Sequence, residues 1–215
     1  MSKSILDLKP KSVWKHFYEF TRIPRPTGQM EEITEYVKKV GNELDLEVKQ
    51  DKAGNVVIIK PASKGYEGRP GVILQAHLDM VPQKNSDVDH DFSKDPIETI
   101  IEGDIVRANS TTLGADNGIG AAMMLALLED NSLQHAEVEC LFTVDEEVGM
   151  DGAFGLEEGY VKGKYMLNLD TEEDGEICIG CAGGADMNIT FGYEEDKEID
   201  KGDVAVKISL TGLNG

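Results

Sequence analysis

Residues 136–144, Ala-Glu-Val-Glu-Cys-Leu-Phe-Thr-Val, constrain the fold of this chain more than any other run. Alternate side chains from Ala136 to Val144 are apolar, a period typical of a β-strand packed in a sheet. Three carboxylates, Asp-Glu-Glu at residues 145–147, follow this run directly. Adjacent negative charges repel one another and do not help folding, but they suit a cation site and proton transfer. The run therefore predicts a buried strand that ends at a metal site, as in a metal-dependent hydrolase.

Strand patterns alternate with helical patterns along most of the chain, which predicts an α/β fold built in layers. Apolar residues at helical spacing indicate a first helix that opens at Pro10 and Ser12, and a second helix over residues 30–44. The stretch 118–128 is apolar nearly all round, which is typical of a buried helix. The predicted strands are residues 47–49, 55–60, 71–76, 136–144 and 165–169, with a short helical piece near 153–158.

A domain boundary is predicted at Gly183-Gly184, because only strand patterns follow it, at residues 186–191 and 204–210. Residues 1–183 would form the first domain, and residues 184–215 the start of a second. The chain stops at a turn-like sequence, Thr-Gly-Leu-Asn-Gly, with no element after it. We therefore expect the second domain to be truncated.

The charge of the chain excludes two classes of partner. With 21 Lys and Arg against 41 Asp and Glu, the formal net charge is −20, which argues against nucleic acid and against an anionic membrane. The first ten residues contain no apolar signal segment, and no run reaches membrane-spanning length. Three cysteines do not make a disulfide framework, so we expect a cytoplasmic protein.

His77 and Asp79 come directly after the predicted strand over residues 71–76. Residues two apart in a strand point the same way, so the Asp79 carboxylate can accept a hydrogen bond from the His77 ring. Such a carboxylate fixes the tautomer of a metal-binding imidazole and raises its basicity. A histidine satisfied within the core, beside a surface aspartate, explains the same pair equally well.

Asp116 and Asp170 are two further candidate ligands at the ends of predicted elements. Asp116 lies in the glycine-rich turn Gly-Ala-Asp-Asn-Gly at residues 114–118, where it could bridge two metal ions. Taken alone, it is better explained as the N-cap of the helix that follows. Asp170 closes the strand at residues 165–169, and a turn-initiating role explains it as well as a ligand role does.

Glu146 and Glu147 are adjacent, so we expect their side chains to diverge. One could bind a metal while the other faces the substrate and an activated water. This matches the division between metal ligand and general base in metallopeptidases. An acidic surface loop is the alternative.

Together, the four motifs resemble those of the M20 metallopeptidase family of dinuclear zinc peptidases and deacylases. Their order is His-x-Asp, Gly-Ala-Asp-Asn-Gly, Asp-Glu-Glu-Val-Gly and Leu-Asp. The surrounding segments Gln-Ala-His-Leu-Asp-Met-Val, Thr-Thr-Leu-Gly-Ala-Asp-Asn-Gly-Ile-Gly and Ile-Gly-Cys-Ala-Gly-Gly look like those of the aminoacyl-histidine dipeptidases. The resemblance runs over essentially the whole chain.

The resemblance implies a role for each motif residue. His77, Asp116 and Asp170 would hold one zinc ion, and Asp116 would bridge to a second zinc ion held by Glu147. Asp79 would orient His77, and Glu146 would be the general base for hydrolysis of Xaa-His dipeptides. Carboxylate-rich pockets also accept Mn²⁺ or Co²⁺.

The resemblance also implies a larger protein than these 215 residues. The family completes its second zinc site with a histidine near its C-terminus, and no histidine of this chain matches that position. It also inserts a lid domain through which the full-length protein would form a homodimer. We therefore expect a three-layer mixed sheet with flanking helices in a zinc-peptidase-like catalytic domain, then the truncated start of an α+β lid domain.

With an incomplete second metal site, this chain is expected to have little activity. Two alternatives to a Xaa-His dipeptidase stay open. Tripeptidases, carboxypeptidases and N-acyl amino-acid deacylases share the metal residues, so another activity of the same family is one alternative. The other is a non-catalytic module that binds metal or a partner and retains the fold.

Overall fold

A computed structural model describes residues 4–171, 173, 175–180, 183, 187–192, 194, 201–202 and 204–209. The chain divides into two units, Met1–Gly175 and Glu176–Gly215. In the second unit, the described residues within 186–191 and 204–210 belong to no strand, so the strand prediction is wrong for them. An alternating pattern predicts a face but not a partner, and a strand needs a partner for its backbone hydrogen bonds. The boundary at residues 183–184 stays a prediction.

A five-stranded sheet lies at the centre of the first unit, in the order β1-β2-β6-β3-β7. The strands are β1 (Glu47–Gln50), β2 (Val56–Lys60), β3 (Val72–His77), β6 (Val138–Thr143) and β7 (Tyr165–Asn168). The strands β6, β3 and β7 run parallel, whereas β1 and β2 are antiparallel neighbours at one edge. The predicted mixed sheet and its five strands are confirmed, with ends that differ by at most two residues.

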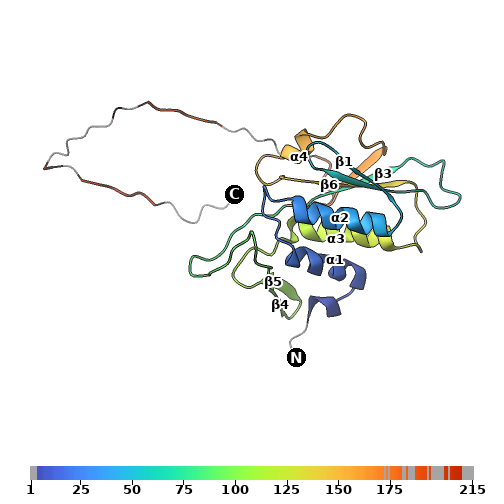
Figure 1. Ribbon diagram of the computed structural model, residues 1–215, viewed down its shortest axis with the longest axis horizontal. Helices are drawn as coiled ribbons and strands as arrows, with labels where there is room; N and C mark the ends of the chain where they lie inside the picture. The colour runs from blue at the N-terminus through green and yellow to red at the C-terminus, as the bar shows by residue number, and fades with distance from the viewer. Residues whose placement is uncertain are drawn as a thin grey trace. The chain divides into compact units, whose positions relative to one another are not determined.

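Helices cover one face of this sheet, as Figure 1 shows for α2 and α3. These two helices are α2 (Glu31–Glu43) and α3 (Ala115–Glu129), whereas α1 (Lys11–Arg22), which follows a 3₁₀ turn, η1 (Ile5–Asp7), packs against α3. The short helix α4 (Asp151–Phe154) lies on the opposite side of the sheet in the same view. It begins two residues before the predicted piece near 153–158. The three-layer α/β prediction is confirmed.

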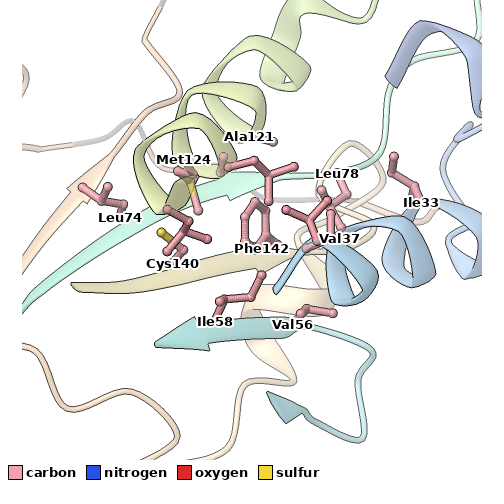
Figure 2. Close-up of a cluster of buried hydrophobic side chains, with 14 of the residues drawn as sticks. Ile33, Val37, Val56, Ile58, Leu74, Leu78, Ala121, Met124, Cys140 and Phe142 are labelled. Atoms are coloured by element: carbon pink, nitrogen blue, oxygen red, sulfur yellow. The ribbon is translucent and has the colours of Figure 1, made fainter. Parts of the chain in front are cut away.

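The alternation predicted for β6 is found in the packing of its two faces. Val138, Cys140 and Phe142 belong to the main core beneath α2 and α3, whereas Leu141 packs in a smaller cluster on the other face. Figure 2 shows Phe142 and Cys140 among Met124 of α3 and Val37 of α2. Both faces of β6 are thus buried, which fixes the strand that leads to residues 145–147.

The sequence reasoning missed a second, two-stranded sheet of β4 (Thr99–Glu102) and β5 (Ile105–Ala108). Gly103 and Asp104 form its turn, and Gly103 has a φ of 61°. A Gly-Asp pair between two apolar runs is a hairpin signal that could have found it. Among the described residues, no helix is long and apolar enough to cross a membrane.

Lys60 of β2 caps the end of α3 through its ammonium group. The Nζ atom donates to the carbonyls of Leu127, Leu128 and Asp130 at 3.2, 2.8 and 2.7 Å. These carbonyls lie at the negative end of the helix dipole, where a cation is stabilising. Burial lowers the pKa of Lys60, and the charge of Asp130 partly offsets this effect.

Replacing Lys60 with Met is expected to lower the free energy of unfolding by about 1–3 kcal/mol, because it leaves buried carbonyls without a donor. Urea denaturation followed by circular dichroism would measure the loss. Lys52→Met is the matched control, since the Lys52 side chain is 91% exposed. Equal midpoints for the two variants would show that the contacts of Lys60 do not stabilise the helix end.

Candidate metal centre

The carboxyl ends of three parallel strands bring the predicted site residues to one edge of the sheet. His77 is the last residue of β3, residues 145–147 follow β6, and Asp170 comes two residues after β7. Ligands of open α/β sheets bind outside such strand ends. Asp116 joins them from the start of α3, which lies against β3.

The His77 ring is the centre of the cluster and is only 1% exposed. Its Nε2 lies 2.9 Å from Oδ1 of Asp116 and 3.7 Å from Oδ1 of Asp170. Its Nδ1 lies 3.3 Å from Oδ1 of Asp79 and 3.1 Å from the Asp79 backbone oxygen. The two ring nitrogens therefore face different partners. The one facing Asp116 and Asp170 is the one available to a metal ion.

Asp116 does not cap α3, which was the alternative explanation for it. Among the described residues, the Asp116 carboxylate accepts no hydrogen bond from a backbone N–H of this helix, and its partner is the His77 ring. The backbone at Asp116 and Asn117 is non-helical, and regular helix follows it. The Asp116 side chain instead reaches His77 and stays half exposed.

Asp79 is fully buried, and four groups hold its carboxylate. Besides His77, the hydroxyl of Thr27 donates at 2.9 Å, and the backbone N–H groups of Glu146 and Glu147 donate at 3.0 and 3.2 Å. Burial raises the pKa of Asp79, but these hydrogen bonds outweigh it and lower the pKa to about 2. Asp79 thus orients the imidazole and also fixes the loop that carries both glutamates.

Glu146 and Glu147 do not diverge as expected. One carboxylate oxygen of each lies within 4.8 Å of the other and of a His77 ring nitrogen. The expectation holds for a strand, but here the backbone turns: Asp145 has a φ of 51°, and the N–H groups of Gly149 and Met150 donate to the Glu146 carbonyl. In a turn, adjacent side chains can point to the same side.

Asp145, which had no assigned role, anchors this turn. Its Oδ1 accepts a hydrogen bond of 2.7 Å from the N–H of Gly28. Thr27, which donates to Asp79, and Gly28, which donates to Asp145, lie in the same short loop. Residues 24–28, Pro-Arg-Pro-Thr-Gly, make up this loop, which follows α1. Two prolines in five residues are the signal of a rigid loop that could have drawn attention to it.

The charges of the cluster shift the pKa values of its members. Burial lowers the pKa of His77, but the hydrogen bond to Asp79 and the charge of Asp170 raise it to about 9 overall. Burial raises the pKa of Asp170, as do its hydrogen bond with Asp116 and the negative charges of Asp116 and Glu146, whereas the charge of His77 opposes the shift. Burial also raises the pKa of Glu147. Several carboxylates crowded around an imidazole favour the binding of a cation, because it offsets their negative charges.

The donor set fits a divalent cation. Two groups of potential ligand atoms lie within 4.8 Å of one another: His77, Asp116 and Asp170, and His77, Glu146 and Glu147. Imidazole nitrogen with carboxylate oxygen is a ligand set used for Zn²⁺ and related metals. The described residues therefore contain a possible metal-binding group.

Two hollows open beside this group and leave room for a substrate. One has a volume of about 270 Å³ and is lined by Met80, Asp116 and Glu147 among others. The second, about 250 Å³, is lined by Asp116, Asp170 and Thr171 among others. Asp116 borders both, so a molecule in either hollow would contact the candidate ligands.

Comparison with known proteins shows the family. Residues 73–206 match the sequence profile of Peptidase family M20/M25/M40, which is more than half of the chain. The chain is 47% identical over 209 residues to the cytosol non-specific dipeptidase of Escherichia coli, covering 97% of this chain and 43% of that protein. It belongs to peptidase family M20.

Solved structures agree with this assignment. The crystal structure of the aminoacylhistidine dipeptidase from Vibrio alginolyticus matches with a TM-score of 0.79 and 48% identity, over 80% of this chain and 35% of that one. A tripeptidase from Staphylococcus aureus matches with a TM-score of 0.65 and 24% identity, over 76% and 44%, which shows the shared fold alone. The chain spans less than half the length of these relatives.

Proposed function

We propose that the chain forms the metal-binding part of a dinuclear-zinc dipeptidase. His77, Asp116 and Asp170 would hold one zinc ion, and Glu147 and Asp116 would hold a second. The observation that carries the proposal is the convergence of the His77 ring with carboxylates from separate segments of the chain. The buried Asp79 behind the ring supports it, because metal-binding histidines commonly donate their second N–H to a carboxylate.

Glu146 is the proposed general base. A bound divalent cation would supply Lewis acidity, polarising a peptide carbonyl and making a nearby water more acidic. Glu146 would accept the proton of the attacking water and deliver it to the leaving amine. The site supports this role because one Glu146 oxygen lies within 4.8 Å of the His77 ring nitrogen. The hydrogen bond from its own N–H to Asp79 fixes its backbone.

The proposed substrates are dipeptides with a C-terminal histidine. Of the two similar proteins, one is named a non-specific dipeptidase and the other an aminoacylhistidine dipeptidase. The two names agree on dipeptides and differ in breadth. A panel of alanyl-histidine, alanyl-alanine, a tripeptide and an N-acetyl amino acid would separate these activities.

The wider organisation is proposed on the same basis. Residues 1–183 would form the catalytic domain, and residues 184–215 would begin a lid domain through which the full-length protein dimerises. A cytoplasmic location would suit the resemblance to a cytosolic dipeptidase. Size-exclusion chromatography with light scattering on the full-length protein would test the dimer.

Replacing His77 with Gln tests the metal site itself. His77 belongs to both groups of candidate ligands, so its loss is expected to weaken zinc binding by at least about 100-fold, since loss of a group outside the ligand set already costs about 10–100-fold. Titration of the chain with Zn²⁺ by calorimetry would measure it. His135→Gln is the matched control, since His135 belongs to neither group and its ring contacts the Ala136 carbonyl. Equal zinc affinity in the two variants would count against the proposed site.

A further inference from the structure

Arg25 places a positive charge inside the protein without a paired carboxylate. Its side chain is 1% exposed, and it takes part in none of the ion pairs found among the described residues. Burial lowers the pKa of its guanidinium to about 10, and the charges of Asp79 and Asp116 oppose this shift. Arg25 is therefore still charged at neutral pH. An isolated buried charge is costly, so its contacts call for an explanation.

The guanidinium joins two segments that carry candidate metal ligands. Its Nη1 donates to the carbonyls of Leu78 and Asp79 at 2.8 and 3.2 Å, and its Nη2 donates to the carbonyl of Gly114 at 2.5 Å. Leu78 follows His77, and Gly114 lies two residues before Asp116. One planar group thus links the end of β3 to the turn before α3.

The glycines of that turn make room for the guanidinium. A Cβ atom at Gly118 would lie 2.6 Å from Nη2 of Arg25, and a Cβ at Gly114 would clash with the same atom. The guanidinium carbon also lies 5.6 Å from the centre of the Phe20 ring. The glycine-rich turn, which the sequence linked to metal binding or to a helix N-cap, is also shaped around Arg25.

We propose that Arg25 is a positioning residue for the metal centre, one that sets the distance between His77 and Asp116. This inference rests on the proposed function, because it concerns the same ligands. The rigid fork of the guanidinium fixes the Leu78 and Gly114 carbonyls relative to each other, and the two ligands are each within two residues of those carbonyls. The contact of 2.9 Å between Nε2 of His77 and Oδ1 of Asp116 is the geometry it would hold.

A lysine could not do the same work. Its ammonium is a single point on a flexible stem, whereas arginine presents several N–H groups in a fixed plane. Arg25→Lys therefore keeps the charge and removes the fork. Arg25→Met removes the charge as well as the fork. Comparing the two variants separates a role of the fork geometry from a role of the charge alone.

Titration with Co²⁺, read from its visible absorption spectrum, tests the proposal on the chain as it stands. We expect both Arg25→Lys and Arg25→Met to weaken Co²⁺ binding by about 10–100-fold, as loss of outer groups does at metal sites, and to change the band shape. Arg69→Lys and Arg69→Met are the matched controls, since Arg69 is exposed. Parent affinity and an unchanged spectrum in folded Arg25→Lys would overturn the proposal. A lower melting temperature with an unchanged spectrum would overturn it as well, because it would mark a merely structural role.

Gly118→Ala provides a second route that leaves Arg25 in place. Alanine is a better helix former than glycine, so helix propensity would not explain a loss of Co²⁺ affinity in this variant. The loss would instead follow from the clash between the new Cβ atom and the guanidinium of Arg25. We expect weaker binding in this variant, and little further loss when Arg25→Lys is added to it, since both changes remove the same contact. Fully additive losses, or parent affinity in Gly118→Ala, would contradict the proposal. If the parent itself bound no Co²⁺, the proposed function would fail, which is a result distinct from these.

Discussion

Replacing Glu146 with Gln is expected to slow hydrolysis of alanyl-histidine by about 10²–10⁴-fold, the usual contribution of general acid–base catalysis. Glutamine matches glutamate in size and can still accept a hydrogen bond, but it cannot take up a proton at neutral pH. Zinc affinity should change far less than in His77→Gln, because Asp116 and Asp170 remain in place beside the ring. Released histidine, quantified by chromatography over long incubations, would measure slow turnover.

Glu158→Gln is the control for this variant, because it is the same substitution at an exposed position. It should match the parent in both rate and zinc affinity. Equal rates in the parent and Glu146→Gln would contradict the role of Glu146 as the base. That outcome would favour the alternative of a non-catalytic metal-binding module. Equal rates together with tight zinc binding would retain the metal site and reject only the chemistry.

The fold was predictable where buried elements show a regular pattern of apolar residues in the sequence. The alternation in β6 and the apolar stretch of α3 both correspond to elements packed in the core. The hairpin of β4 and β5 was missed because its strands are short and half exposed, so their pattern is weak. The order of strands in the sheet could not be read at all, since pairing depends on partners far apart in the chain.

The candidate site was predictable as a set of residues but not as a set of contacts. Motif order led to His77, Asp116, Glu147 and Asp170, and the ends of parallel strands together with the start of α3 bring them to one place. The convergence of Glu146 with Glu147 was not predictable, because it depends on a turn that Asp79 and Gly28 hold from elsewhere in the chain.

Arg25 marks the limit of sequence reasoning most clearly. A lone arginine between two prolines reads as an exposed loop residue, since arginine is rarely buried unless it is paired. Its partners are backbone carbonyls of two other segments. Every residue has a backbone carbonyl, so the sequence does not show which of them will accept a hydrogen bond from Arg25. Only the folded chain shows that Arg25 contacts the segments that carry the candidate ligands.

Replacing Phe142 with Ala is expected to lower the free energy of unfolding by about 3–5 kcal/mol, the usual cost of emptying a buried aromatic site. Phe142 is fully buried in β6, paired with Val56 of β2 on one side and Ala76 of β3 on the other. Its ring packs among residues of α2 and α3, so its removal leaves a cavity where sheet and helices meet. Domains are commonly stable by only about 5–15 kcal/mol, so the loss would be a large part of the total.

Urea denaturation would show this loss as a lower midpoint with an unchanged slope, the mark of a change in stability alone. Phe154→Ala removes the same atoms from a side chain that is 81% exposed, and it should cost no more than about 0.5 kcal/mol. Zinc titration of Phe142→Ala at low temperature adds a second comparison, because residues 145–147 begin three positions after Phe142. If the core positions that loop, zinc affinity should fall in Phe142→Ala and stay at the parent value in Phe154→Ala. A stability loss without any change in zinc affinity would instead show that Asp79, Thr27 and Gly28 hold the loop without help from the core.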